Sequence, residues 1–243
     1  MCGRYAIIQP PEVLQEYFGY EDRPNFPPRY NIAPTQPVPV VHEQDGNHRF
    51  TLMRWGFVPG WVKDFKSFPL VINIRSETLR EKASFRAAFQ RRRALMPADG
   101  FYEWQRLGRD KRPFLLRCPD RSLFAFAALS ETWSGADGSE LDTVALVTTH
   151  ANGTLAAIHE RSPVILAQEH FKAWLNPHTP AEDAYRLLQP PPNDLLEMVA
   201  ISAAVNTVAH DGPELHEPPG QEKNVIVRPR KKPIPNDDQG RLF

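Results

Sequence analysis

The chain carries a cysteine directly after its first methionine, in the opening stretch MCGRY, and this position gives Cys2 a special chemistry. Cysteine is small enough to permit removal of Met1, which would place a free α-amine and a thiol on the same residue. Their ordinary pKa values, about 7.7 to 8.0 and about 8.5, make both groups usable nucleophiles near neutral pH. An aldehyde would condense with the amine to an imine, and the thiol would then close a thiazolidine ring. The alternative is a buried terminal cysteine that does no chemistry.

Polar residues inside otherwise apolar or aromatic segments are candidates to assist that chemistry: Asn73 in LVINIRSET, Glu103 in PADGFYEW and His159 in LAAIHERSPVIL. A carboxyl group buried between Tyr102 and Trp104 would have a raised pKa, and a histidine titrates in a useful range. The pair could therefore move protons during imine formation. Each residue also has a simpler interpretation. Glu103 fits the outward face of an edge strand, His159 the end of a helix, and Asn73 a turn or a bulge.

The apolar runs that must position these residues are strand-length and rich in Val, Ile, Phe, Tyr and Trp. They span residues 49–59, 68–76, 93–104, 112–133, 141–150 and 162–167. Helices are predicted over residues 10–19, 76–93, 152–159, 168–175, 182–188 and 194–198. The prolines between 24 and 39 predict irregular connections there. The expected fold class is α+β, a single domain with a curled, mainly antiparallel and barrel-like β-sheet and short flanking helices.

Composition and charge limit the class of protein. The 243 residues include 41% apolar side chains, enough for a sizeable core, and 29 basic residues balance 29 acidic ones, so overall charge favours neither a nucleic acid nor a membrane as partner. No apolar run approaches a membrane span or a signal peptide, so we expect a cytoplasmic protein whose two cysteines are thiols, with Cys118 a packing or turn residue. Residues 219–243 carry six basic and three acidic side chains and are expected to form a disordered tail after a domain at 2–218.

Several other chemistries lack their sequence signatures. The motif HExxH is absent, and the two cysteines are too far apart in sequence for a zinc-binding pair. Neither a P-loop nor a GxGxxG motif occurs. The sequence therefore predicts no metal site and no cofactor.

Taken together and in this order, a series of segments resembles the SRAP family, named for SOS response-associated peptidases: MCGRY, PPRYNIAPTQ, MRWGFVPGW, INIRSET, MPADGFYEW, TTHAN, IHERSPVIL and VNTVAHDGPEL. The resemblance covers about residues 1–218. It implies a sensor of abasic sites in single-stranded DNA that shields the lesion during the DNA damage response through a covalent thiazolidine cross-link. It also implies a monomer in the bacterial cytoplasm, on the nucleoid when bound to DNA.

The same resemblance implies a role for each candidate residue. Cys2 would be the covalent nucleophile after removal of Met1, and Asn73 would orient its amine and thiol. Glu103 would assist proton transfer during the attack, and His159 would help to open the sugar hemiacetal and shuttle protons. An abasic deoxyribose is a masked aldehyde whose ring must open before an amine can add, so an acid and a base are required.

A DNA-binding protein also requires phosphate donors and planar stacking surfaces, and the family-like segments supply both. The predicted DNA-binding residues are Arg4, Arg29, Pro34, Trp55, Trp61, Arg75, Thr148, Thr149 and Arg161. Pro34 and the threonine pair are expected to lie in loops. For any single tryptophan, a place in the core is at least as good an interpretation.

Other functions stay open at the level of sequence. An N-terminal-nucleophile peptidase or amidase would use Cys2 to attack an amide, with its own amine as the base, in a limited form during removal of Met1. A DNA-binding module would hold single-stranded DNA without a covalent bond. The stretch QGRLF also resembles the short peptides that dock on bacterial sliding clamps, through Gln239, Leu242 and Phe243.

Overall fold

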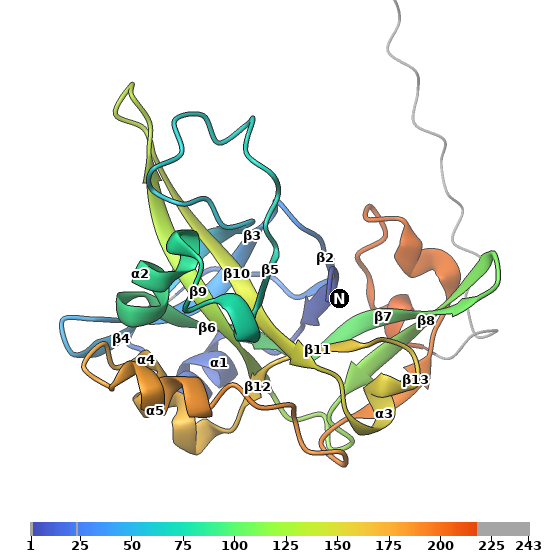
Figure 1. Ribbon diagram of the computed structural model, residues 1–243. Coiled ribbons are helices and arrows are strands. Elements are labelled where there is room, and N and C mark those ends of the chain that lie inside the picture. The colour runs from blue at the N-terminus through green and yellow to red at the C-terminus, as the bar shows by residue number, and fades with distance from the viewer. Residues whose placement is uncertain (1, 23, 218–243) are drawn as a thin grey trace, which may run out of the picture.

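Five strands close into a barrel at the centre of the fold (Figure 1). The computed structural model describes residues 2–22 and 24–217. The strands are hydrogen-bonded in the order β10-β4-β3-β6-β9 and back to β10, and every pair is antiparallel except β10–β4. Their bounds are β3 (Pro37–Gln44), β4 (Asn47–Trp55), β6 (Arg93–Ala98), β9 (Phe124–Ser134) and β10 (Glu140–His150). The predicted barrel-like, mainly antiparallel sheet is confirmed.

Short strands extend the barrel sheet beside β10 and β9. Both β5 (Asn73–Arg75) and β11 (Arg161–Pro163) pair with the last part of β10, while β12 (Ile165–Leu166) pairs with β9. In this register Thr148 of β10 lies opposite Arg75 on one side and Pro163 on the other. Two segments that are far apart in sequence thus flank the C-terminal end of the same strand.

A second sheet of five strands packs against the barrel. Its order is β13 (Glu197–Ala200), β8 (Asp110–Arg117), β7 (Gly100–Leu107), β1 (Tyr5–Ile7) and β2 (Arg29–Ile32), and every pair is antiparallel. The ring of Tyr5 packs edge-on against Trp55 and Phe126 of the barrel, with ring centroids 5.4 and 6.0 Å apart. The first strand of the chain therefore belongs to the second sheet and packs its Tyr5 ring against the barrel.

The chain crosses from the barrel to the second sheet at Asp99 and Gly100. The Asp99 Oδ2 atom accepts hydrogen bonds from the main-chain N–H groups of residues 8–9, just after β1. A Cβ atom on Gly100 would lie 3.0 Å from the carbonyl oxygen of Leu116, so a side chain there would push β7 away from β8. Asp99 therefore holds the end of β1 beside the start of β7, and the glycine lets β7 lie close to β8.

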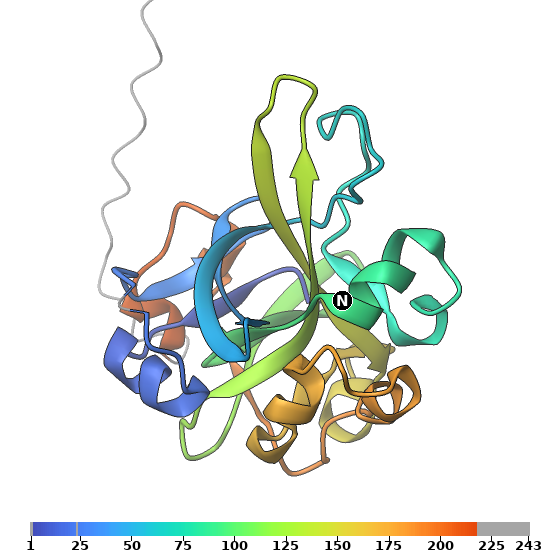
Figure 2. The same cartoon turned by 90° about the vertical axis from the view of Figure 1, so that its left-hand side faces the viewer.

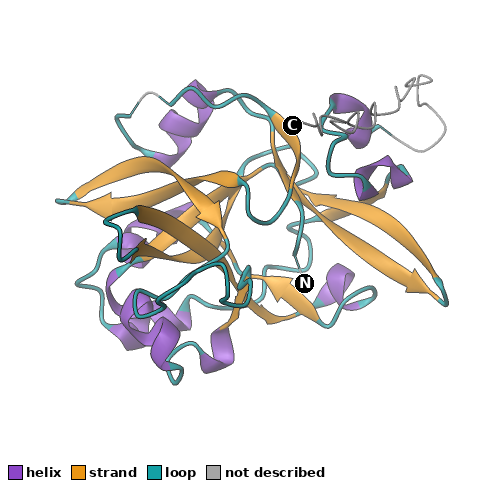
Figure 3. Cartoon of the chain, turned by 90° about the horizontal axis from the view of Figure 1, so that it is seen from above, coloured by secondary structure: helices purple, strands orange, loops and turns teal. Residues whose placement is uncertain are grey.

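Short helices lie around the strands (Figure 3). They are α1 (Pro11–Phe18), α2 (Ala83–Arg91), α3 (Gly153–Ala156), α4 (Phe171–Leu175) and α5 (Ala181–Arg186), with 3₁₀ turns η1 (Ser76–Thr78), η2 (Gln168–His170), η3 (Ala203–Asn206) and η4 (Pro213–His216). Helix α1 begins at Pro11 and ends before Gly19, whose φ of 68° lets its N–H donate to the carbonyl of Gln15. Within residues 2–22 and 24–217, no helix is long and apolar enough to cross a membrane.

A long hairpin formed by β9 and β10 rises out of the body of the molecule (Figure 2). The loop over residues 56–72 lies beside it, and a small apolar cluster of Val58, Val62 and Trp133 joins the two. The indole N–H of Trp133 donates to the carbonyl oxygen of Val62 at 2.6 Å. The loop that leads from β4 to Asn73 is therefore packed against the hairpin.

The structure corrects the helix prediction for residues 194–198. Strand β13 begins at Glu197 and pairs with β8, where Met198 lies opposite Leu116. The local sequence has helix-forming residues, but pairing with a neighbouring strand overrides that preference. The helix predicted over 76–93 is likewise interrupted, because η1 and α2 are separate and Arg93 already belongs to β6.

Two predictions of irregular structure were also wrong. The proline-rich stretch between residues 24 and 39 contains β2 and the start of β3. Pro39 is tolerated because β6 pairs with β3 only at Val41 and His42, so the missing N–H of Pro39 interrupts no pairing with β6. The threonine pair Thr148–Thr149 lies inside β10 and not in a loop.

Candidate active site

Cys2 lies just before β1 and belongs to the main hydrophobic core, together with residues of the barrel strands. It has no exposed surface, and its Sγ atom lies 3.8 Å from the carbonyl oxygen of Arg4. The same carbonyl accepts the main-chain N–H of Tyr102 in β7 at 2.9 Å. Burial raises the pKa of the Cys2 thiol well above its ordinary value, and the negative charge of Glu103 raises it further. The thiol is therefore protonated at neutral pH.

Asn73 stands at the start of β5 and binds the main chain of Cys2. Its Nδ2 atom donates to the Cys2 carbonyl oxygen at 3.0 Å. Its Oδ1 atom is buried and has no hydrogen-bond partner within residues 2–22 and 24–217. The side chain thus holds Cys2 with one end and presents a buried acceptor with the other, which suits a nearby amine N–H donor.

Glu103 reaches the same place from β7. Its register partner is Phe114 in β8, and only 4% of the residue is exposed. It therefore does not lie on the outward face of an edge strand. Because its charge raises the pKa of the Cys2 thiol, the carboxylate and the sulfur lie within electrostatic reach of each other.

His159 follows α3 and is fixed by main-chain hydrogen bonds. The main-chain N–H of His159 donates to the carbonyl oxygen of Leu155 at 2.9 Å. The ring Nδ1 atom of His159 accepts a hydrogen bond from the main-chain N–H of Arg161, also at 2.9 Å. A ring nitrogen that accepts a hydrogen bond carries no proton, so the neutral imidazole has its proton on Nε2. His159 therefore presents a hydrogen-bond donor from Nε2.

Arg161 makes four hydrogen bonds to other groups of the protein. Its guanidinium makes a bidentate ion pair with Glu77, at 2.6 and 3.0 Å, and donates to the carbonyl and hydroxyl oxygens of Thr148 at 2.8 and 3.1 Å. The hydrogen bonds from Arg161 hold the pKa of the Glu77 carboxyl below its ordinary value. His150 also contacts Glu77, at 3.2 Å.

Two other predicted DNA-binding arginines have partners inside the protein. Arg4 donates to the Asn31 side chain at 2.6 Å and to the carbonyl of Val205 at 2.8 Å. Arg29 pairs with Asp211 at 2.5 Å. These contacts tie β1 and β2 to the segment after β13, so both arginines hold the N-terminal strand in place.

The remaining predicted residues differ in exposure. Trp55 is fully buried in the barrel and donates from Nε1 to the carbonyl of Ile72, as in the core alternative. Trp61 is 66% exposed. Among the other predicted DNA-binding residues, Arg75 is exposed, Pro34 is partly buried, and Thr148 and Thr149 are buried.

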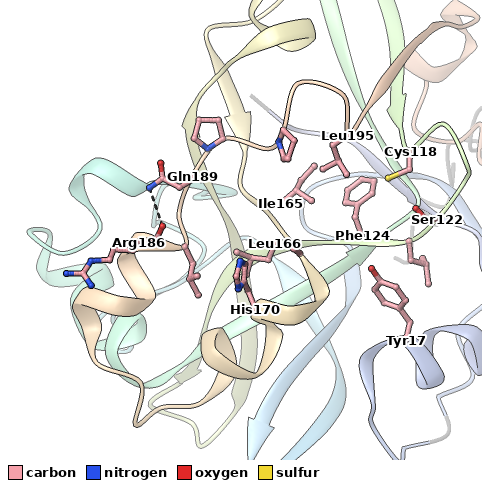
Figure 4. Close-up of a pocket in the computed structure, with 15 residues that line it drawn as sticks. Tyr17, Cys118, Ser122, Phe124, Ile165, Leu166, His170, Arg186, Gln189 and Leu195 are labelled. Atoms are coloured by element: carbon pink, nitrogen blue, oxygen red, sulfur yellow. Dashed lines mark hydrogen bonds between the residues drawn. The ribbon is translucent and has the colours of Figure 1, made fainter.

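A separate cavity of about 370 Å³ lies between α1, β12 and the segment after α5 (Figure 4). Cys118 and Tyr17 line one end of it and Arg186 and Gln189 the other. Burial raises the pKa of the Cys118 thiol, which fits its predicted role in packing. None of the four candidate catalytic residues lines this cavity, so it is distinct from the site around Cys2.

In the part of the chain that the structure describes, no three acidic, histidine or cysteine side chains are placed to hold a metal ion together.

The sequence alone did not single out Glu77, Asn31 or Asp211 as site residues. Each lies in one of the family-like segments, and each binds a predicted arginine. A polar side chain inside such a segment was the available signal. It names no partner, because Glu77 and Arg161 are 84 positions apart.

The fold and the site together define a β-barrel protein that encloses its N-terminal cysteine beside an asparagine and a glutamate. The family model described as SOS response associated peptidase (SRAP) matches residues 1–208, and the chain belongs to this family. The chain is 39% identical over 222 residues to the abasic site processing protein YoqW of Bacillus subtilis, covering 89% of this chain and 99% of the relative. It is 30% identical over 228 residues to the abasic site processing protein YedK of Escherichia coli, covering 90% and 100%.

The fold is also shared with solved structures. A protein from Bacteroides thetaiotaomicron superimposes with a TM-score of 0.81 at 22% identity, covering 89% of this chain and 99% of that one. At this identity the similarity supports the α+β barrel fold and nothing finer.

Proposed function

We propose that this protein processes abasic sites in single-stranded DNA by forming a covalent thiazolidine cross-link through Cys2 after removal of Met1. The names of its relatives, abasic site processing proteins, support the substrate. The observation that carries the chemistry is the contact between the Asn73 amide and the Cys2 carbonyl at 3.0 Å, with the buried Oδ1 acceptor beside it. That arrangement would orient the α-amine of a processed Cys2.

The order of the steps follows from the state of the thiol. Because the thiol is held in its protonated form, the amine is the first nucleophile. It attacks C1′ of the ring-opened sugar, and loss of water gives the imine. The thiol then adds to the imine carbon, forming the C–S bond, while its proton passes to the imine nitrogen. In this proposal Glu103 carries that proton, and His159 assists the opening of the sugar ring.

The DNA strand would contact the exposed members of the predicted set. Arg75 and Trp61 supply a cation and a planar face, and Pro34 offers a partly exposed apolar surface. The buried members of the set, Trp55, Thr148, Thr149 and Arg161, would hold the site together from inside the protein. We propose that the protein binds DNA as a monomer in the cytoplasm and needs no cofactor. The clamp-docking peptide at Gln239, Leu242 and Phe243 and the tail over 219–243 lie outside the described residues.

The protonation state of Cys2 argues against the peptidase alternative. A cysteine peptidase needs a thiolate, whereas burial and Glu103 keep the Cys2 thiol protonated. The same argument counts against self-removal of Met1, because the raised pKa is that of Cys2 in the chain that still carries Met1.

The test uses the processed protein and a single-stranded oligonucleotide with one abasic site. We expect an adduct that survives denaturing electrophoresis in the wild type and in Cys118→Ala, whose thiol lines the separate cavity, and none in Cys2→Ala. Catalytic turnover of amide substrates would favour the peptidase, and salt-sensitive retention without an adduct would favour a non-covalent binder. Either of those two results would overturn the proposed function.

A further inference from the structure

The hairpin formed by β7 and β8 carries an excess of positive charge at its tip. This hairpin extends away from the body of the fold (Figure 1). Residues 106–112 include one acidic side chain, Asp110, and four basic ones, Arg106, Arg109, Lys111 and Arg112, all of them exposed. Among the residues that the structure describes, none of these four cations has an ion-pair partner. The tip therefore offers unpaired positive charge in a chain whose charges balance overall.

Two of the cations face each other across the hairpin. Arg106 of β7 lies directly opposite Lys111 of β8. Like charges in directly opposite positions of antiparallel strands are destabilising, because their side chains share a face and repel each other. A polyanion bound across the hairpin would remove this repulsion. The pairing thus costs stability in the free protein and favours a negatively charged partner.

Arg112 lies on the face of the hairpin that carries Glu103. Glu103 is opposite Phe114, and Gln105 is opposite Arg112. Residues two apart along a strand share a face, so the pair with Arg112 follows the pair with Glu103 on the same side, about 7 Å further along the strand. The Arg112 guanidinium lies 5.2 Å from the centroid of the Phe114 ring. This contact holds a positive charge near the candidate active site.

The exposed cation of the barrel sheet, Arg75, approaches Cys2 from another direction. Asn73 reaches the Cys2 carbonyl from β5, and Arg75 is two residues further along that strand. In Figure 1, β5 and β7 lie on either side of the N-terminal end of the chain. A strand that passes over Cys2 would meet Arg75 on one side and the β7–β8 hairpin on the other.

We propose that the tip of the β7–β8 hairpin is a phosphate-binding arm for single-stranded DNA, and that Arg112, Arg106 and Lys111 contact the backbone on the side of the abasic nucleotide away from Arg75. This inference deepens the proposed function and rests on it for the choice of DNA as the polyanion. Phosphates follow one another along a strand, as these cations do along the hairpin, and contacts to them need no particular base sequence.

The test measures how salt weakens the binding of DNA. The probe is a labelled single-stranded oligonucleotide with a tetrahydrofuran in place of the abasic sugar, which has no aldehyde and cannot be cross-linked. Each phosphate contact with a single strand adds about 0.7 to the slope of log affinity against log salt. We expect Arg112→Gln to lower the slope by about 0.7, and the double variant Arg106→Gln with Lys111→Gln to lower it by about 1.4.

A matched control removes the same charge elsewhere. Arg86 of α2 is exposed and has no ion-pair partner in the described part of the chain, so Arg86→Gln should keep the wild-type slope. The double variant should also keep or raise the melting temperature, because it relieves the repulsion between Arg106 and Lys111. A lower melting temperature would contradict the argument from like charges.

The side of the lesion is tested with two shorter oligonucleotides, one with the tetrahydrofuran at its 5′ end and one with it at its 3′ end. We expect the hairpin variants to weaken binding of one of them, and Arg75→Gln to weaken binding of the other. Effects of both on the same oligonucleotide would overturn the assignment of sides.

Other results would overturn the arm itself. They are slopes within about 0.2 of the wild type in all hairpin variants, no binding of the probe by the wild type, or hairpin variants that lose binding to vesicles of anionic lipid while their DNA slope is unchanged. A wild type that cross-links abasic DNA with unchanged slopes in the variants would refute the arm alone. A wild type that forms no adduct, with lowered slopes in the variants, would refute the covalent function and leave the arm supported.

Discussion

Asn73→Ala removes the amide that binds the main chain of Cys2. The change deletes the 3.0 Å hydrogen bond to the Cys2 carbonyl and leaves that buried oxygen without its donor. An unsatisfied buried polar group costs about 1 to 3 kcal/mol. If this cost falls on the reacting geometry, the maximal rate of cross-linking drops by about 5- to 150-fold, since about 1.4 kcal/mol corresponds to a factor of ten.

The assay follows single-turnover adduct formation with excess abasic single-stranded oligonucleotide, read on denaturing gels. The Asn73 amide binds the main chain of Cys2, so we expect the maximal rate to fall while the half-saturating DNA concentration stays the same. A matched control is Gln168→Ala, which removes another side-chain amide that donates to a main-chain carbonyl at 3.0 Å, here that of Tyr17 at the end of α1. The control should react like the wild type.

A particular result would refute the reasoning. If Asn73→Ala cross-links within about twofold of the wild-type rate, then the bond to the Cys2 carbonyl does not position the reacting groups. If instead only the half-saturating concentration rises, Asn73 acts in DNA binding and the assigned role is wrong.

Other predictions follow from burial. Nε2 of His216 and the Tyr102 hydroxyl form a hydrogen bond of 2.8 Å, and burial lowers the pKa of His216 from 6.5 to about 4. Between these pH values the unfolded chain binds a proton at His216 that the folded protein does not bind. Stability should fall by up to about 3 kcal/mol as the pH drops from 6.5 towards 4, and urea denaturation of His216→Gln should lack most of this slope. Phe126→Ala leaves a cavity in the barrel beside Tyr5 and should lower the free energy of unfolding by about 3 to 5 kcal/mol, measured by thermal or urea denaturation. A decrease of less than about 1 kcal/mol would contradict the close packing of this ring. The Cys2 thiol should resist alkylation by iodoacetamide at neutral pH and react as the protein unfolds, and rapid labelling of the native protein would show that it is not protonated and buried.

Local patterns predicted a large part of the fold. The strands containing Trp55, Glu103 and Leu146 and the helix around Phe89 follow from short-range periodicity and appear where expected. The closure of the barrel does not follow from such patterns, because the parallel pairing of Thr143 with Arg54 joins strands that are distant in sequence. Strand β13 was missed for the same reason.

The sequence by itself determined the chemistry that is available: a cysteine whose amine and thiol can act together, and an amide, a carboxylate and an imidazole in apolar surroundings. Only the tertiary structure decided which side chains are buried and which partners they bind. It buried Trp55 and Arg161, paired Arg161 with Glu77, and placed the proton of His159 on Nε2. The physical reason is that burial and hydrogen-bond partners depend on distances through space, and strand pairing brings together residues whose separation along the chain carries no information about contact.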